Sequence, residues 1–528
     1  MSEIAGIVNL DGAPVDRELL WNDGTVGFAK QPFTLDGDVW LIADARIDGA
    51  GEVADEEAIL RAYERFGDDC VEHLIGDFAF AIWDRRARRL FCARDHFGVK
   101  LFFYARVGNG FVFSNALNVL RRDARVSDEL NESAVGDYLA LGLNQDLSST
   151  IFRDIQRLPP GHTLSLANGA ITTRRYWTPS VKDEIRFRDP RSYVDRFNEL
   201  FTAAIKDRLP TDRVSISMSG GLDSTSIAVI ARDQIAAMEA FTVVYDELIP
   251  DEERHYATVA ASSTGIPIHH VRADKYGLFE GELNQPEPFL ISPFSGQFNE
   301  LMRLMAANAS VALTGYDGDA LMNETTGARP FWQRIRRIKE KPIEVEWPQW
   351  IDESFAKRIN LKERVREAWN APGVDKRRPA SLRALQTKVW APLFEGYHES
   401  ATRLPIEVRH PFIDVRLVDY LLSIPVKPWC VNKHILRCAM KDRLPAAVVD
   451  RPKTPLAADP ALQLRRRAGV RWLDNFEVTP QLTRFVNLKV RRSLAEEETP
   501  NALWASLRLF ALNHWLKHSL PLDRRMVA

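Results

Sequence analysis

A strand, a glycine-rich turn and a helix follow one another directly at residues 214–233, and this run constrains the fold more than any other segment. The apolar stretch VSISM leads into SGGLDST (219–225), and STSIAVIARD continues with helical spacing. Two adjacent glycines let the backbone approach a charged group closely, and the N-terminus of the following helix offers unpaired N–H groups. The run is therefore expected in a parallel α/β sheet, at a turn that binds an anion.

The turn at 219–225 is suited to a pyrophosphate group. The hydroxyls of Ser219, Ser224 and Thr225 add hydrogen-bond donors to the backbone N–H groups. An Asp beside bound phosphates implies a cation between them, so Asp223 is a candidate Mg²⁺ ligand. No Lys follows the glycines, which excludes the GxxxxGK[ST] phosphate loop. The alternative is a Gly-Gly turn in which Asp and Ser only cap the helix.

A second apolar strand ends in another polar turn, LTGYDGD (313–319). Ligands of parallel sheets bind at the carboxyl ends of the strands, so we expect Asp223 and Asp319 around one metal ion. Taken alone, this segment is also consistent with a plain acidic turn.

The 528 residues divide into two parts of different texture. Up to about residue 170, short strands alternate with Gly and Asp turns and one helix at 55–67, which favours stacked antiparallel sheets. From 191, helices alternate with strands as in a parallel sheet, and after about 320 the pattern is almost entirely helical. We predict one domain at 1–180 and a second at 191–528, with a helical insertion at about 325–395.

Composition excludes several classes of protein. The chain has 70 Lys and Arg against 72 Asp and Glu, so no basic field predicts nucleic-acid binding. The four cysteines are scattered, which argues against a disulfide framework or a zinc site. The sequence shows neither a run of about 18 apolar residues nor an N-terminal signal, so we expect a cytoplasmic protein without a membrane span.

Four stretches, in this order, resemble the asparagine synthetase family over nearly the whole chain. They are GDFAFAIWDRRARRLFCARDHFGVKLFFY (76–104), MSGGLDSTSIA (218–228), LTGYDGDAL (313–321), and RHPFIDVRLVDYLLSIP with KHILRCAMKDRLPAAVVDRPK (409–425 and 433–453). The resemblance implies an N-terminal α+β domain, an Ntn-hydrolase-like antiparallel sandwich related to glutaminases. It also implies a C-terminal α/β ATP-pyrophosphatase domain, similar to adenine nucleotide α-hydrolases, with many helices.

The same resemblance implies roles for individual residues. ATP phosphates would be bound by Ser219, Gly220, Gly221, Asp223, Ser224, Thr225 and Gly315. Asp223 and Asp319 would hold Mg²⁺, and Lys453 would reach the reacting acyl-adenylate. Without the resemblance, Lys453 would be interpreted as a solvated lysine at a helix end.

The N-terminal part departs from the family at the residues that a glutaminase needs. Such enzymes have Cys at position 2 as the nucleophile, whereas this chain has Ser2 followed by Glu3. The glutamine-holding Asn-Gly pair is replaced by Asp44-Ala45, and the RGPD segment has no counterpart. Asp55 matches the amine-binding Asp, although by itself it would only cap a helix. We therefore expect no glutaminase activity and an acceptor amine that belongs to the substrate itself.

Tyr316 favours the amide-closing branch of the family, that of β-lactam synthetases and lasso peptide cyclases. Asparagine synthetases usually have Glu at this place, whereas β-lactam synthetases have a Tyr that works with a Glu as a catalytic dyad. The expected partner of Tyr316 is Glu399, with Glu395 second, although Glu399 also fits an exposed helix glutamate. A carboxylate and the cation of Lys453 would tune the phenol so that it helps to deprotonate the amine.

The insertion indicates the substrate. Residues 329–378 contain 14 Lys and Arg against eight Asp and Glu, with Trp332, Trp347, Trp350 and Trp369 interleaved. Aromatic and Arg side chains favour peptide binding, although an amphipathic lid packed on its own domain is also consistent. We prefer a lasso peptide cyclase acting on a peptide precursor, with a leader-binding protein and a leader peptidase as candidate partners. The alternatives are a β-lactam-type or other small-molecule amide synthetase, a glutamine-independent asparagine synthetase-like protein, and a non-catalytic scaffold.

Overall fold

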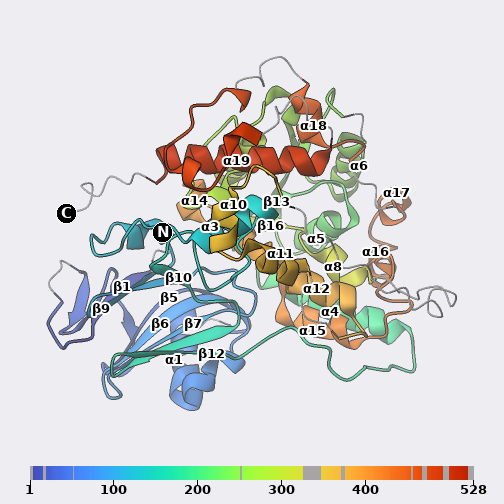
Figure 1. Ribbon diagram of the computed structural model, residues 1–528. Coiled ribbons are helices and arrows are strands. Elements are labelled where there is room, and N and C mark those ends of the chain that lie inside the picture. The colour runs from blue at the N-terminus through green and yellow to red at the C-terminus, as the bar shows by residue number, and fades with distance from the viewer. Residues whose placement is uncertain are drawn as a thin grey trace, which may run out of the picture.

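Two domains lie side by side in the computed structural model, an antiparallel β domain followed along the chain by an α/β domain (Figure 1). The structure describes residues 4–15, 19–51, 53–249, 252–324, 347–369, 375–452, 456–466, 473–490 and 499–520. The predicted fold class, an antiparallel sandwich followed by a parallel α/β domain with many helices, is confirmed. None of the described helices has the length and apolar character needed to cross a membrane.

Two six-stranded antiparallel sheets form the first domain. The strands of one sheet are β1 (Ala5–Asn9), β2 (Trp21–Asp23), β3 (Val26–Phe28), β8 (Phe103–Val107), β9 (Gly110–Ser114) and β10 (Ile155–Arg157). The strands of the other are β4 (Phe33–Thr34), β5 (Val39–Ile47), β6 (Gly76–Asp84), β7 (Arg89–Arg94), β11 (His162–Ala167) and β12 (Ala170–Arg175). Their orders are β10-β8-β9-β1-β3-β2 and β12-β11-β7-β6-β5-β4.

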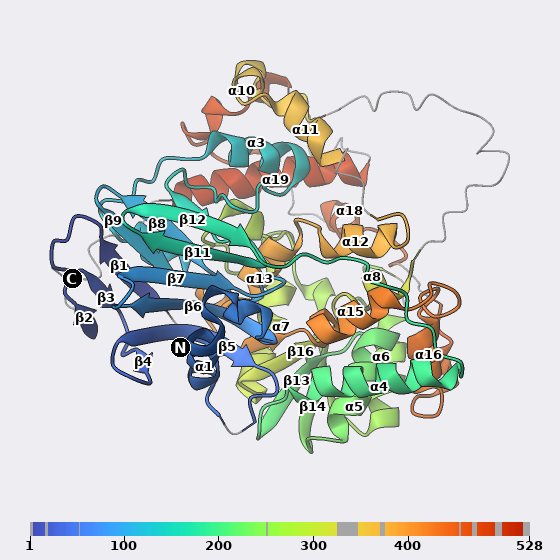
Figure 2. The ribbon, with the colours of Figure 1, turned by 90° about the horizontal axis from the view of Figure 1, so that it is seen from below.

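The side chains of β6 alternate between two cores, as the period of a strand requires. Ala79 and Ala81 face the apolar core between the sheets, whereas Phe78, Phe80 and Ile82 face the opposite side. The helix α1 (Asp55–Phe66), close to the predicted 55–67, covers that opposite side beside β4 and β5 (Figure 2). Both faces of the second sheet are therefore buried.

A five-stranded parallel sheet carries the second domain. Its strands are β13 (Arg213–Ser217), β14 (Ala237–Val244), β15 (Ile268–Arg272), β16 (Val311–Thr314) and β17 (Glu407–Arg409), in the order β15-β14-β13-β16-β17. The helices α5 (Leu222–Arg232) and α6 (Glu253–Thr264) connect β13, β14 and β15, and α7 (Ser295–Asn308) precedes the return to β16. The strand order thus reverses between β13 and β16, which is where sheets of this kind bind ligands.

The described chain after β16 is almost entirely helical, as predicted, and β17 is its only strand. The helices are α8 (Gly318–Met322), α10 (Glu353–Arg358), α11 (Leu361–Trp369), α12 (Pro379–Leu385), α13 (Trp390–Tyr397), α14 (Glu399–Thr402), α15 (Val415–Ser423), α16 (His434–Met440), α17 (Ala446–Val449), α18 (Pro460–Arg465) and α19 (Pro500–His518). The first domain also contains α2 (Leu117–Arg121) and α3 (Glu132–Leu141), so the expectation of a single helix there was wrong.

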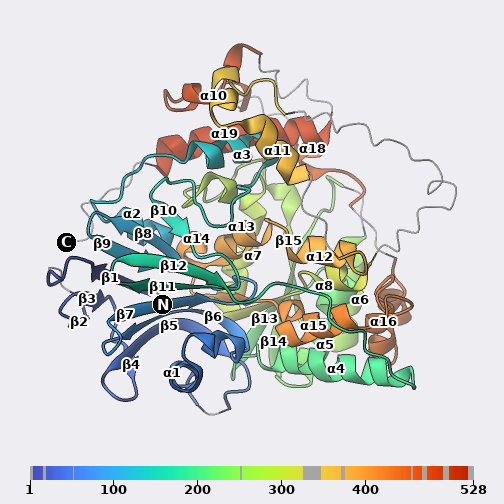
Figure 3. The ribbon, with the colours of Figure 1, turned by 60° about the horizontal axis from the view of Figure 1, so that its bottom comes forward.

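The helix α3 joins the two domains by packing against α11 and α19 of the second domain (Figure 3). Gly136 allows this close approach, because a Cβ there would lie 2.1 Å from the Ile359 side chain. Arg364 pairs with the buried Asp137 at 2.5 Å, and Arg358 pairs with Glu132 at 2.7 Å. The described part of the predicted insertion is therefore anchored on the first domain.

Buried ion pairs also connect the domains elsewhere, and two of these places matter for the site described below. Lys100 Nζ lies 2.7 Å from an Asp44 oxygen and 2.8 Å from a Glu407 oxygen on β17. Arg157 of β10 pairs with Glu287 and, at 2.7 Å, with Glu395 of α13. The first domain thus contacts both the edge strand and a helix that lie next to the cavity described below.

Candidate active site

A cavity of about 770 Å³ opens where the carboxyl ends of β13 and β16 meet. The turns after these two strands form part of its wall, and a later segment around 432–452 completes it. Among its lining residues are Ser219, Gly221, Asp223, Ser224, Gly315, Tyr316, Asp319, Lys433, Arg437 and Arg451. The two turns that the sequence predicted to bind a ligand therefore face one cavity.

The turn after β13 presents only some of its predicted residues to the cavity. Gly220 has φ +71°, and a Cβ there would lie 2.4 Å from the Ala257 backbone nitrogen, so the turn requires glycine and packs on α6. Thr225 is fully buried, and its hydroxyl donates to the Gly221 carbonyl at 2.8 Å. Gly220 and Thr225 therefore shape the turn from behind, whereas Ser219, Gly221 and Ser224 line the cavity.

The turn after β16 lies directly against the first turn. A Cβ on Gly315 would lie 2.7 Å from the Ser224 backbone nitrogen, and a Cβ on Gly318 would lie 2.6 Å from the Asp223 carboxyl carbon. Asp317, between these glycines, is in the left-handed region with φ +75°. The two glycines allow the carboxylates of both turns to gather at one point.

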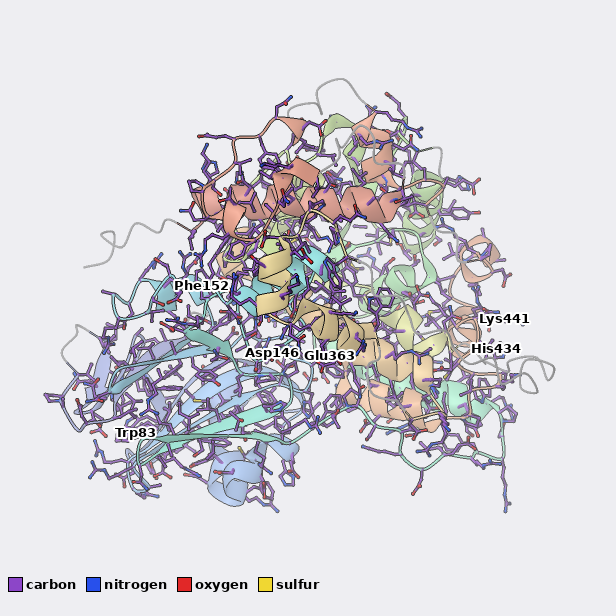
Figure 4. All side chains as sticks on the ribbon, in the orientation of Figure 1. Trp83, Asp146, Phe152, Glu363, His434 and Lys441 are labelled. Carbon is purple, nitrogen blue, oxygen red and sulfur yellow. The ribbon has the colours of Figure 1, made fainter. Side chains whose placement is uncertain are left out.

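Lys433 supplies the positive charge at this point. Its Nζ lies 2.6 Å from an Asp223 oxygen and 2.7 Å from an Asp319 oxygen. Burial, together with the charges of Asp223 and Asp319, raises the pKa of Asp317 to about 7. Even with Asp317 neutral, Asp223 and Asp319 bring two negative charges against the one positive charge of Lys433, so this cluster favours a further cation. Lys433 directly precedes His434, the first residue of α16. Figure 4 places His434 in the second domain, far from Trp83 of the first domain.

The residues present fit Mg²⁺ that arrives with a nucleotide. Mg²⁺ is usually held by one or two carboxylates plus substrate phosphates, and Asp223 and Asp319 supply the carboxylates. Within the described ranges, no group of three or more His, Cys, Asp and Glu side chains could hold a metal ion by itself. The remaining ligands would therefore come from the phosphates and from water.

Tyr316 borders the cavity from the second turn and is 44% exposed. Its hydroxyl lies 3.2 Å from the hydroxyl of Tyr397, at the end of α13. Both rings also contact His410, whose Nδ1 lies 2.7 Å from the Thr314 hydroxyl. Burial lowers the pKa of His410 to about 4, so this ring is neutral. The two side chains that contact the Tyr316 ring or hydroxyl here, Tyr397 and His410, are therefore aromatic and uncharged.

The predicted carboxylate partners of Tyr316 lie elsewhere. Glu395 is buried and pairs with Arg157 at the domain boundary. Glu399 begins α14, and its carboxylate makes no hydrogen bond or ion pair with any residue that the structure describes. The third predicted catalytic residue, Lys453, lies outside the described residues. The expected Tyr316–Glu dyad is therefore not formed, and a second phenol takes the place of the carboxylate.

Arg451 is a cavity residue that the sequence reasoning missed. Its guanidinium lies 3.8 Å from the Tyr256 ring centroid, pairs with Glu253 at 2.9 Å and donates to the Gly220 carbonyl at 3.4 Å. Arg451 and Lys433 both belong to the KHILR…RPK stretch, which was assigned only Lys453. The density of basic residues in that stretch was the available signal for a phosphate-binding wall.

Asp44, which the sequence resemblance places at the family's glutamine-holding pair, belongs to a buried ion network in the first domain. Asp44 is 3% exposed, pairs with Lys100 at 2.7 Å and accepts a hydrogen bond from Asn115. Asp55 does not cap α1, because Ala54 is the N-cap, and its carboxylate instead accepts from the Ile47 N–H at 2.8 Å. Ser2 lies outside the described residues.

The tryptophans of the insertion do not form one surface. Trp350 belongs to the hydrophobic core and is 5% exposed, Trp347 packs partly buried against the same core, and Trp369 is exposed. Trp332 lies outside the described residues. Of the three described tryptophans, Trp369 is exposed and Trp347 is partly exposed, so the expected aromatic peptide-binding surface is not supported at Trp350.

Comparison with known proteins gives two family matches that follow one another along the chain. Residues 50–177 match the family described as glutamine amidotransferase domain, and residues 196–517 match asparagine synthase. Asparagine synthetase [glutamine-hydrolyzing] 3 of Bacillus subtilis (strain 168) is 26% identical over 449 residues, which cover 76% of this chain and 70% of that protein. Asparagine synthetase [glutamine-hydrolyzing] 2 of the same organism is 25% identical over 555 residues, which cover 86% and 71%.

Among solved structures, glutamine phosphoribosylpyrophosphate amidotransferase from B. subtilis is 14% identical, with 51% of this chain and 59% of that chain covered. Its TM-score is 0.23, which is too low to say anything further about the fold.

Proposed function

The chain belongs to the asparagine synthase family, and on this premise we propose that it closes a macrolactam within a peptide precursor. The family uses ATP, and the chain is an ATP-dependent amide-forming ligase that releases AMP and pyrophosphate. The proposal adds the substrate. An Asp or Glu side chain of a ribosomally made peptide is activated, and the N-terminal amine of the same peptide attacks it.

The proposed reaction has two steps. First, a substrate carboxylate oxygen attacks the α-phosphorus of ATP, the bond to the β-phosphate breaks, and pyrophosphate leaves. The N–H groups of the first turn, Lys433 and Arg451 line the cavity where this negative charge develops. Mg²⁺, held by Asp223 and Asp319, would neutralise phosphate charge when bound. Second, the amine nitrogen bonds to the acyl carbon, the C–O bond to AMP breaks, and the nitrogen loses its proton.

The observation that carries the proposal is the ion network around Asp44. Asp44 pairs with Lys100, both side chains are buried, and the resemblance puts Asp44 at the family's glutamine-holding pair. Removing either charge from such a pair is costly, so the network does not open to admit a substrate. No ammonia is then made in the first domain, and the nitrogen has to come from the substrate.

A small-molecule amide synthetase of the β-lactam type is the second candidate. The burial of Trp350 favours it, because one of the four tryptophans expected to cover a peptide belongs to the core instead. The two candidates share the adenylation step and differ in the length of the substrate.

A panel of synthetic peptides tests the proposal. Each peptide has a free N-terminal amine and one Asp or Glu at a different position, and the readouts are ATP–pyrophosphate exchange and loss of one water from the peptide by mass spectrometry. Matched peptides with an acetylated amine should still be adenylated but not closed, and those with Asn or Gln for the acid should do neither. ATP–pyrophosphate exchange with small β-amino acids, but with none of the peptides, would favour the second candidate, a small-molecule amide synthetase of the β-lactam type.

Glutamine is the control for the nitrogen source. Glutamate release from glutamine would contradict the proposal, because it would mean that the first domain is an active glutaminase.

A further inference from the structure

Among the described residues, the hydroxyls of Tyr316 and Tyr397 are hydrogen-bonded only to each other, at 3.2 Å. Tyr316 belongs to the turn after β16 and borders the cavity, whereas Tyr397 ends α13 behind it. The distance is at the long end for two hydroxyls, but the rings also touch edge to face with centroids 6.1 Å apart. The two phenols therefore form a defined pair, one at the cavity and one behind it.

The direction of the hydrogen bond follows from what surrounds the two hydroxyls. Each has one hydrogen to donate, and only one of the two hydrogens can lie between the oxygens. If Tyr316 donated, the hydrogen of Tyr397 would have no acceptor among the described residues, and an unmade bond at this partly buried side chain is unfavourable. If Tyr397 donates, the hydrogen of Tyr316 is directed toward the cavity, where water or a ligand can accept it.

The surroundings of Tyr397 keep its phenol protonated and in place. Burial, with Tyr316 close by, raises the pKa of Tyr397 well above its usual value, so it remains a donor at any physiological pH. Its ring contacts Phe298 of α7 and the neutral ring of His410. No charged group is hydrogen-bonded to either phenol within the described residues.

We infer that Tyr397 is a positioning residue, which holds Tyr316 as a hydrogen-bond donor toward the acyl carbonyl oxygen of the adenylate. This inference rests on the proposed adenylate chemistry and refines the role that the sequence suggested for Tyr316. A phenol without a carboxylate partner has nothing to pass a proton to, whereas a phenol that accepts a bond from behind has its own hydrogen free to donate. Tyr316 then acts as a donor and not as a base.

The donor would act when the amine attacks. As the N–C bond forms, the carbonyl electron pair moves to oxygen, and Tyr316 donates a hydrogen bond to this oxyanion. The oxyanion then collapses, the C–O bond to the α-phosphate breaks, AMP leaves with that electron pair, and the nitrogen releases its proton to water. Preorganised donors aimed at developing charge are a large source of catalysis because they need no rearrangement during the reaction.

The test is a binding measurement that needs no peptide. The probes are 5′-O-(N-acetylsulfamoyl)adenosine, a stable mimic of an acyl-adenylate, and ATP with Mg²⁺, both measured by calorimetry on the full chain. Tyr316→Phe and Tyr397→Phe should each weaken the acyl mimic by about 2- to 10-fold, the range for a hydrogen bond between neutral groups, and leave ATP binding unchanged. The double variant should bind no more weakly than Tyr316→Phe alone, because Tyr397 acts through Tyr316.

Three results would overturn the inference. They are unchanged binding of the acyl mimic by Tyr397→Phe, equal weakening of ATP and mimic, which indicates a purely structural role, and losses that add in the double variant. Tyr104→Phe, in the first domain, removes a phenol hydroxyl far from the cavity and should change neither ligand. Thermal unfolding of each variant shows that it is folded. A wild-type protein that binds neither ligand would refute the proposed function itself, which is a different outcome.

Discussion

Lys433 shows what local sequence could and could not predict at the level of single residues. Asp223 and Asp319 were predicted to meet because each follows a strand of the same sheet, and strand ends are a local signal. Lys433 precedes a short helix like many surface lysines, yet its ammonium lies between the two carboxylates. Tyr397 was missed for the same reason, since the position of α13 against the sheet is decided by tertiary packing. Among the described residues, no hydrogen bond joins Tyr316 to Glu399.

Asp223→Asn and Asp319→Asn should abolish adenylation. Each removes one carboxylate that Mg²⁺ would need, and loss of such charge stabilisation corresponds to several kcal/mol, or about 10²-fold or more. Calorimetry of ATP with and without Mg²⁺ should show that the variants lose the Mg²⁺-dependent part of binding. Asp233→Asn, at the exposed end of α5, is the matched control and should behave as wild type. Normal pyrophosphate release by either active-site variant would contradict the metal assignment.

Tyr316→Phe should separate the two half-reactions. The hydroxyl contributes most when the amine attacks, so adenylation should fall by no more than the loss of adenylate binding, about 2- to 10-fold. Ring closure should slow by about 10²-fold, the range for loss of one transition-state donor. Pyrophosphate and macrolactam measured in the same reaction would show AMP formed without product. An equal fall in both would place Tyr316 in ATP binding or in folding.

At the level of elements, α3 was not predicted because its sequence lacks the periodic pattern of an amphipathic helix. The cap signals are present: Asn131 accepts from the Ala134 N–H, and Gly142 ends the helix at φ +86°. What is missing is an amphipathic stripe, because α3 is buried between α11 and α19 and is apolar on several sides. Strands such as β5, VWLIADARI at 39–47, belong to the run of short strands predicted up to about residue 170, since β5 is buried on both faces and begins with the apolar run VWLIA.

Trp350→Ala should lower the stability of the folded protein and should not selectively weaken substrate binding. The side chain is in the core beside α10, and removing a buried Trp typically lowers the free energy of unfolding by about 3–5 kcal/mol. Trp369→Ala, at an exposed position on α11, is the comparison and should leave thermal unfolding within about 0.5 kcal/mol of wild type. Wild-type stability of Trp350→Ala with selective loss of peptide binding would restore the sequence-based interpretation.

At the level of the whole molecule, ion pairs attach the first domain to the part of the second domain that holds Tyr316 and Tyr397. Lys100 reaches Glu407 on β17, the strand that leads to His410 beside Tyr316. Arg157 reaches Glu395 on α13, the helix that ends at Tyr397. The first domain therefore contacts the helix that ends at Tyr397 and the strand that leads to His410 beside Tyr316.

Lys100→Met should destabilise the domain boundary in a pH-dependent way. Burial alone would raise the pKa of Glu407, but Lys100 and Arg409 outweigh it and hold that pKa well below its ordinary value. A lowered carboxylate pKa stabilises the folded state above the unfolded value of about 4.3, and this stability is lost as pH falls below it. Leaving Asp44 and Glu407 without Lys100 should lower the free energy of unfolding by about 3–5 kcal/mol at neutral pH.

Denaturant unfolding of both proteins at a series of pH values checks this. The acid fall in stability should be shallower in Lys100→Met than in wild type, and Lys182→Met, whose lysine forms an exposed ion pair with Asp419, should change neither stability nor slope. Equal acid slopes in wild type and Lys100→Met would show that the network does not link the domains.

The most direct test of the account follows one oxygen atom. A peptide from the panel that supports exchange is made with oxygen-18 in its single side-chain carboxylate, and the AMP formed on closure is analysed by mass spectrometry. The account predicts one labelled oxygen in AMP, unlabelled pyrophosphate, and a cyclic peptide lighter by one labelled water. Label in inorganic phosphate, or closure with unlabelled AMP, would contradict an acyl-adenylate formed on the substrate carboxylate.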